Sequence, residues 1–170
     1  RLIELAPANI GYQRQLAALL LSSGDNPAAQ QVIDKALEIQ PENASLAEDR
    51  IAIALKTSGL DGALSAARQL QTAHPKLPNA PALEGDAYML AGKYAEAAAT
   101  YATALKQAPS TMLAVALAKA KAAAGDADGA ASTLRDWTKA HPDDKGVFAM
   151  LGTYDLAARR FEDAKRELET

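Results

Sequence analysis

Apolar residues recur at intervals of three to four along most of the chain, and short polar stretches interrupt this pattern at regular distances. Between residues 27 and 39, for example, Ala29, Ile33 and Ala36 fall on one face, which is typical of an amphipathic helix. The pattern predicts an all-α fold with helices over 11–23, 27–39, 44–57, 61–73, 80–91, 95–107, 111–124, 127–140, 145–158 and 161–169.

Prolines close every second predicted helix at a nearly constant spacing. Pro7, Pro41, Pro75, Pro109 and Pro142 stand 34, 34, 34 and 33 residues apart. Each would end the apolar run before it, because proline lacks the N–H and its ring clashes with the preceding turn. A second break lies midway between the prolines, and four of its five copies, "SSGDNP", "TSGLDG", "LAGKY", "AAGDAD" and "AARRF", contain a glycine. The chain therefore repeats helix, tight turn, helix and loop.

This pattern resembles the tetratricopeptide repeat (TPR) family, whose unit of about 34 residues has the form L-G-x₂-Y, then A-x₃-F, then P. The third repeat matches best, with Gly85, Tyr88, Ala97, Tyr101, Ala104 and Pro109. The resemblance covers the whole chain and implies a right-handed superhelical solenoid of antiparallel helix pairs. We expect one array over residues 1–170, in about four full repeats with partial repeats at both ends. Their approximate ranges are 10–43, 44–77, 78–111, 112–144 and, cut short, 145–170, with the end of an upstream repeat at 1–9.

Two repeats depart from the pattern or end early. The second has Arg50–Ile51 where Leu–Gly would stand and Ala67 where an aromatic would, so we expect its helices to pack less tightly. The last helix should turn Phe161, Ala164 and Leu168 inward as its apolar face. We interpret the chain as an excerpt of a longer protein.

Composition narrows the function classes. Hydrophobic residues make up 49% of the chain but aromatic residues only 5%, so the core must consist mainly of aliphatic side chains. The net charge of −3 and the lack of a basic run argue against a nucleic-acid ligand. The chain has no cysteine, which excludes disulfides and thiolate metal sites. No stretch approaches the roughly 18 apolar residues that a membrane span needs, so we expect no membrane insertion within this span.

No set of catalytic or metal-binding residues stands out. His74 and His141 each precede a terminating proline in different repeats, and we interpret them as cations near helix C-termini. The adjacent acids Glu48–Asp49 and Asp143–Asp144 are interpreted as caps or solvated faces, because neighbours on a helix point apart. Trp137 occupies a position whose equivalents in other repeats face the next repeat. We therefore interpret its side chain as a packing residue and not as a ligand contact. Since no nucleotide, zinc or nucleophile motif occurs, we predict no enzyme, no cofactor and no metal site.

The family's geometry implies that first-helix residues line a concave groove that binds a protein or peptide. The candidate partner-binding residues are Arg14, Leu21, Glu48, Lys56, Asp86, Met89, Lys119 and Thr153. Some TPR domains hold a peptide's C-terminal carboxylate with Lys, Arg and Asn in successive repeats, but here Glu48–Asp49 follows Arg14, so that clamp is missing. Isolated charges in a mostly small-residue groove favour an extended or helical segment of modest polarity.

The resemblance thus implies a non-catalytic protein–protein interaction scaffold. The third and fifth repeats look like bacterial TPR lipoproteins of exopolysaccharide and PEP-CTERM export systems. That likeness implies a periplasmic, membrane-tethered protein that organises an export assembly, with the cytoplasm as the alternative location. The alternative function is structural: stacked repeats or terminal faces would mediate weak self-association. A third and less favoured alternative is a regulatory part of an enzyme whose activity lies elsewhere.

Overall fold

The structure, a computed structural model, describes residues 9–157 and 160–168. The chain forms two compact units, which we call the N-terminal unit (residues 1–92) and the C-terminal unit (residues 93–170). The expected end of an upstream repeat at 1–9 lies almost entirely outside the described residues.

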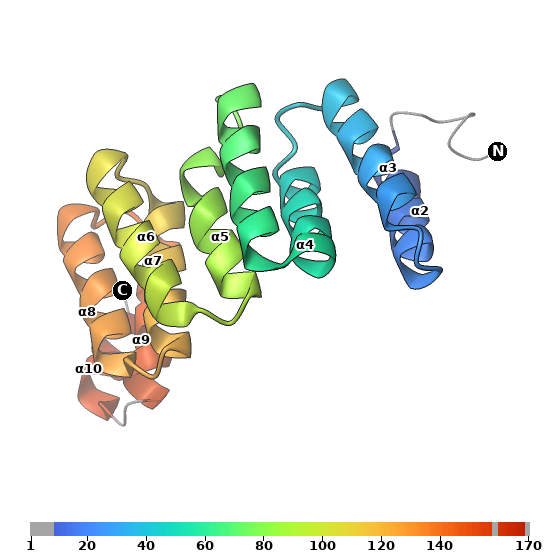
Figure 1. The fold of residues 1–170 in the computed structure, drawn as a ribbon. Helices are drawn as coiled ribbons and strands as arrows, with labels where there is room; N and C mark the ends of the chain where they lie inside the picture. Colours follow the sequence, from blue (N-terminus) through green and yellow to red (C-terminus); the bar gives the residue numbers. More distant parts are fainter. Residues whose placement is uncertain (1–8, 158–159, 169–170) are drawn as a thin grey trace. The chain divides into compact units, whose positions relative to one another are not determined.

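Each unit consists of helices joined by short turns (Figure 1). The N-terminal unit contains α2 (Ile10–Ser22), α3 (Asn26–Ile39), α4 (Ala44–Ala73), the 3₁₀ turn η1 (Ala80–Ala82) and α5 (Leu83–Leu90). The C-terminal unit contains α6 (Tyr94–Gln107), α7 (Thr111–Ala123), α8 (Ala127–Ala140), α9 (Lys145–Ala157) and α10 (Phe161–Leu168). Within each unit, helices that follow one another along the chain pack together as antiparallel pairs. The predicted all-α fold of helix pairs is confirmed.

Prolines end the helices as predicted. Gln40, His74, Ala108 and His141 each precede a proline and cap the preceding helix, with φ between −138° and −128° and ψ between 64° and 79°. A following proline disfavours the α conformation at such a residue. Each cap still donates its backbone N–H to the carbonyl four residues earlier, so the final turn is closed.

Glycines with positive φ form tight turns between consecutive helices. Gly24, Gly59, Gly92 and Gly125 all have positive φ, between 67° and 88°, a region that side chains with a Cβ disfavour. Gly59, at φ 67° and ψ −165°, divides α4 into two helical segments, which correspond to the two helices predicted at 44–57 and 61–73. Short polar side chains cap the next helices: Asp25 accepts from Ala28 N at 3.2 Å, and Asp126 accepts from Gly129 N at 2.8 Å.

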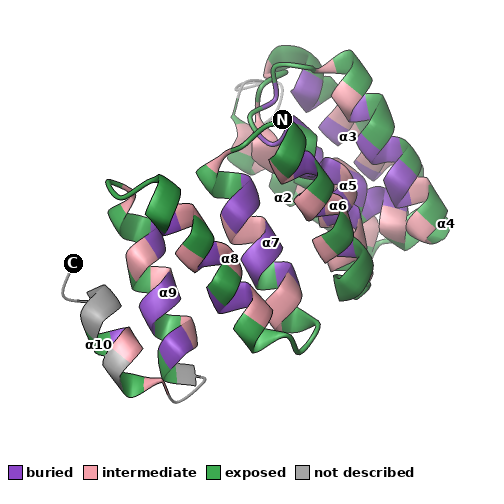
Figure 2. Ribbon diagram, turned by 90° about the vertical axis from the view of Figure 1, so that its left-hand side faces the viewer, coloured by how far each residue is buried: buried purple, intermediate pink, exposed green. Residues whose placement is uncertain are grey.

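Each unit has its own hydrophobic core (Figure 2). Aliphatic residues such as Ile33, Leu46, Ile51 and Leu83 are fully buried in the N-terminal unit. In the C-terminal unit, Leu134, Val147 and Leu151 pack with small alanines. The scarcity of aromatics is thus matched by close packing of small side chains.

The second repeat is well packed, contrary to the expectation from its sequence. Ile51 and Ala67 are fully buried, because alanine at position 67 lets the helices approach closely. Arg50 does not disturb this packing, since its Nε donates to Asp34 Oδ1 of α3 at 2.8 Å.

Ion pairs occur at equivalent places where successive helix pairs meet in the N-terminal unit. Asp34 pairs with Arg50, and 34 residues later Arg68 pairs with Glu84 at 2.9 Å. Both pairs join positions 16 residues apart, but acid and base have exchanged places.

The expected inward face of the last helix is corrected in part. Ala164 is fully buried, as predicted, whereas Phe161 is 62% exposed. Phe161 is the first residue of α10, so it lies at the edge of the helix contact. The side chain of Leu168 lies outside those described.

Candidate partner-binding surface

The first helices of the N-terminal unit contain four of the candidate residues, and three of these take part in contacts between α2 and α4. Arg14 and Leu21 lie on α2, and Glu48 and Lys56 lie on the first segment of α4. Arg14 donates from Nε and from a terminal nitrogen to the carboxylate of Asp49, at 2.5 and 3.0 Å. The charge of Arg14 is therefore paired, which corrects the expectation that it stands isolated.

The interpretation of Asp49 as a cap or a solvated acid is wrong. Its bidentate contact raises the pKa of Arg14 above its ordinary value, chiefly through the hydrogen bond and then through charge attraction, with a smaller contribution from Glu48. The fork of the guanidinium matches the two carboxylate oxygens. The pair therefore fixes the position of α2 relative to the first segment of α4.

Lys56 has a similar structural contact. Its Nζ donates to the backbone carbonyl of Leu21 at 3.2 Å, one of the last carbonyls of α2, which lack partners within the helix. Both contacts join residues 35 apart. In the sequence, these two contacts could have been found by searching, at this spacing, for opposite charges and for a lysine that matches the end of a predicted helix.

Asp86 and Met89 lie on α5, where both are half-buried. Both lie within the helix predicted over residues 80–91. In the N-terminal unit, the side chains of the candidate set that remain most exposed are Arg14, Glu48 and Lys56.

The C-terminal unit contains the other two candidates on α7 and α9. Lys119 is exposed on α7 and forms no ion pair with any residue that the structure describes. Thr153 is exposed on α9, but its hydroxyl donates to Ala149 O of the same helix at 3.0 Å. The positive charge of Lys119 is therefore not neutralised by an acidic group in the described part of the C-terminal unit.

Asp144 joins the beginnings of α7 and α9. It accepts from Thr111 Oγ1 at 2.7 Å and from Trp137 Nε1 at 3.2 Å. These hydrogen bonds, that of Thr111 first, lower the pKa of Asp144, and the backbone N–H of Val147 adds to the effect. The interpretation of Asp144 as a cap is confirmed, with a further role in connecting helices.

Trp137 is a packing residue, as predicted. It is half-buried against the core of the C-terminal unit, and its ring stacks on His141 with centroids 4.0 Å apart. Both histidines lie at helix C-termini, as expected from the sequence.

The sequence pattern did not predict one buried carboxylate. Asp155 of α9 has no exposed surface, and it accepts from Arg135 of α8 at 3.0 and 3.1 Å and from Arg160 Nε at 2.8 Å. Arg160 also pairs with the exposed Asp128, and its pKa is raised, chiefly by the hydrogen bond to Asp155. The cluster holds α8, α9 and the start of α10 together, and its chemistry is structural.

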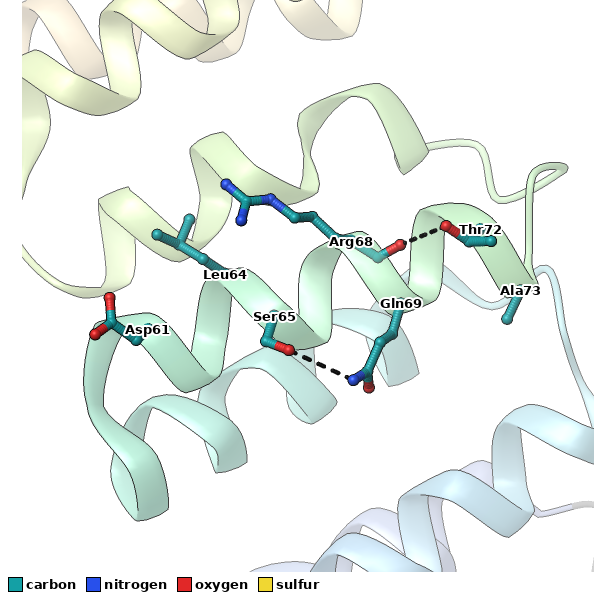
Figure 3. A pocket seen from close by; sticks show the side chains of 7 residues that line it. All are labelled: Asp61, Leu64, Ser65, Arg68, Gln69, Thr72 and Ala73. Atoms are coloured by element: carbon teal, nitrogen blue, oxygen red, sulfur yellow. Dashed lines mark hydrogen bonds between the residues drawn. The ribbon is translucent and has the colours of Figure 1, made fainter.

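A hollow of about 650 Å³ lies along the second segment of α4. Its seven lining residues all come from this one helix, so it is an open surface (Figure 3). Ser65 accepts from Gln69 at 3.4 Å, and Thr72 donates to Arg68 O at 2.9 Å. These contacts are local to the helix and form no catalytic arrangement.

Among the residues that the structure describes, no group of three or more His, Asp or Glu side chains is placed to hold a metal ion. None of the helices in this described part of the chain has the length and apolar character needed to cross a membrane.

Comparison with known proteins identifies the repeat. Two sequence models, both described as tetratricopeptide repeat, match residues 14–78 and 91–153. No curated protein matches the sequence.

Several solved structures have a similar fold. A tetratricopeptide repeat protein from Parabacteroides merdae matches with a TM-score of 0.57 and 16% identity, over 98% of this chain and 66% of that chain. A thermophilic TPR protein from Thermus thermophilus matches with a TM-score of 0.56 and 18% identity, over 92% of this chain and 87% of that chain. MamA from Desulfovibrio magneticus matches with a TM-score of 0.55 and 11% identity, over 94% of this chain and 90% of that chain. At these identities the likeness concerns the fold, and with the two sequence matches it shows that the chain belongs to the tetratricopeptide repeat family.

Proposed function

We propose that this protein is a non-catalytic scaffold that binds a segment of a protein partner along its first helices. The family match supports protein binding as the general role. The observation that carries the proposal is the surface of α7, where the exposed Lys119 and Met112 lie seven residues apart on one helix face. This surface combines an apolar side chain with a charge that the described part of the unit does not neutralise.

The proposed partner segment follows from these side chains. An apolar residue would cover Met112, and a carboxylate one or two helical turns away would reach Lys119. In the N-terminal unit, the pairing of Arg14 with Asp49 leaves Glu48 as an exposed charge. A segment of modest and mixed polarity therefore fits better than a strongly acidic tail.

Site-directed photo-crosslinking tests the proposal. A photoreactive amino acid is placed at Glu48 or Met112 on first helices, and at the exposed Lys35 or Lys139 on second helices as matched controls. The purified protein is then irradiated with an extract of the source organism. The same partner crosslinked from positions 48 and 112, and lost with Lys119→Ala, would support the proposal. Crosslinks from positions 35 and 139 alone would contradict it.

We further propose that the partner belongs to a bacterial exopolysaccharide or protein export assembly. The support is the likeness of the third and fifth repeats to bacterial TPR lipoproteins. Mass spectrometry of the crosslinked partner tests this finer proposal. An envelope export component would support it, and a cytosolic metabolic enzyme would contradict it.

A second candidate function is self-association through the end of the C-terminal unit. Leu156 and Phe161, at 47% and 62% exposure, lie close in sequence at the turn between α9 and α10, and exposed apolar residues of this size favour an interface. Sedimentation of the protein and of its Phe161→Glu variant tests this function. A concentration-dependent dimer lost in the variant would support it, whereas monomers at all concentrations would contradict it.

A further inference from the structure

A crevice in the N-terminal unit lies between α3 and the second segment of α4, and Arg50 of the first segment of α4 also lines it. Its volume is about 260 Å³. Leu37 and Leu70, both almost fully buried, contribute an apolar floor. Gln69 and Ala73, which also line it, leave α4 on a different side from Arg68 (Figure 3). Arg50 is the one lining residue from a first helix, and none of the candidate partner-binding residues lines the crevice.

The polar residues of the crevice leave a negative charge uncompensated. Asp34 accepts from Arg50 at 2.8 Å through Oδ1, whereas among the described residues Oδ2 accepts only a long hydrogen bond, from Gln30 Nε2 at 3.5 Å. Glu38 lies one turn further along α3, is exposed, and forms no ion pair with any described residue. Two carboxylates thus face a single guanidinium.

The ends of the two helices add to this negative potential. The last residue of α3 is Ile39 and that of α4 is Ala73, next to His74 at the rim of the crevice. Helix C-termini have a partial negative charge and favour a cation nearby. The N-terminal unit as a whole has the same sign, with seven basic and ten acidic residues in 1–92, against eleven of each in 93–170.

The apolar floor and negative rim select the kind of cation. A lysine side chain can lay its methylene stem along Leu37 and Leu70 and place its ammonium group between Glu38 and the second oxygen of Asp34. An arginine fork prefers both oxygens of one carboxylate, and at Asp34 one of these is already taken by Arg50. We propose that this crevice receives a lysine side chain of a protein partner, at a surface that includes none of the candidate partner-binding residues.

A titration with a small lysine analogue tests the proposal. Nα-acetyl-lysine methylamide is added at constant ionic strength and pH 7.5 to the ¹⁵N-labelled 170-residue protein, and amide shifts are followed by NMR. The expected shifts fall on the last turn of α3 and on Ala73 and His74. The analogue acetylated on Nε as well has no positive charge, and it should cause no such shifts.

Two variants of equal chemistry complete the test. Glu38→Gln removes the exposed carboxylate of the crevice and should weaken binding about fivefold, as expected for one charge-assisted contact. Glu96→Gln removes an exposed carboxylate on α6 of the C-terminal unit and should leave the affinity unchanged. Shifts absent from the crevice, equal shifts with the neutral analogue, or unchanged binding in Glu38→Gln would overturn the proposal. Stronger binding of the corresponding arginine analogue would overturn the choice of lysine.

Discussion

At the scale of single residues, three carboxylates connect helices that also pack through the hydrophobic cores. Asp49 joins two first helices through Arg14, Asp144 joins α7 to α9, and Asp155 joins three helices through two arginines. They differ in burial, since Asp155 is fully buried whereas Asp49 is half-buried. Their contributions to stability should differ in the same order, because a buried charge depends most on its partners.

Replacing Asp155 with asparagine should lower the free energy of unfolding substantially. The change leaves Arg135 and Arg160 without their shared carboxylate, and breaking a buried pair in this way costs about 3 kcal/mol. Urea denaturation measures the difference. The matched control is Asp128→Asn, which removes the 85% exposed partner of Arg160 and should cost less than about 1 kcal/mol. Equal losses in the two variants would contradict the structural role of Asp155.

The titration of Asp144 should depend on Thr111. Because the folded pKa of Asp144 lies below its ordinary value, its contribution to stability is complete above the unfolded pKa of about 3.9 and is lost as the pH falls through the lower folded pKa. NMR of the carboxyl carbon measures this pKa. Thr111→Val should raise it toward the ordinary value, whereas Thr153→Val, whose hydroxyl contacts only its own helix, should not. An unchanged titration in Thr111→Val would refute the assignment.

At the scale of helices, backbone conformation at a few residues decides where each element begins and ends. Prolines and positive-φ glycines were recognisable in the sequence, so most predicted helix bounds agree with the structure within one or two residues. The start of α5 is the exception, because residues 80–82 form a 3₁₀ turn that contains Pro81. Proline cannot donate the N–H with which Asn79 would cap this turn, and Asn79 makes no side-chain cap there.

Replacing Gly59 with alanine should destabilise the helix pair of α4. A Cβ at this position has no heavy atom within 4 Å, so the cost arises from the backbone alone, about 1–3 kcal/mol for a conformation that is essentially limited to glycine. The control is Gly146→Ala in α9, where space is also open but φ is not positive. That variant should be neutral or stabilised by up to about 1 kcal/mol. Equal unfolding free energies by urea denaturation would contradict the backbone argument.

The contacts between helices were less predictable than the helices themselves. The repeat pattern identifies which positions are small or apolar, and this was sufficient for Ile33, Ala97 and Ala104, all buried as expected. It does not specify which charges meet across neighbouring repeats, since polar surface positions vary freely within the pattern. For this reason Asp155 and the pairing of Arg14 with Asp49 were not foreseen.

At the scale of the whole molecule, the two compact units have separate cores, and stability in repeat proteins is a sum of local terms. The single tryptophan, Trp137, packs against the core of the C-terminal unit. Its fluorescence should therefore report on that unit, whereas far-ultraviolet circular dichroism reports on all helices.

Core truncations in the two units should affect these signals differently. Leu134→Ala and Ile33→Ala each remove a fully buried side chain and should each cost about 2–5 kcal/mol. The urea midpoint measured by fluorescence should fall in Leu134→Ala and remain near the wild-type value in Ile33→Ala. Equal shifts of the fluorescence midpoint in both variants would mean that the chain unfolds as one cooperative body.

The exchanged ion pairs have a consequence for how such a gene can change length. Repeat arrays lose or gain whole repeats, and a deletion of residues 42–75, from one loop to the next, would restore the spacing of 16 residues between Asp34 and Glu84. The carboxylates of Asp34 and Glu84, each of which now pairs with an arginine, would then face each other. A chain that lost its second repeat would therefore exchange two attractive ion pairs for one repulsive contact between like charges.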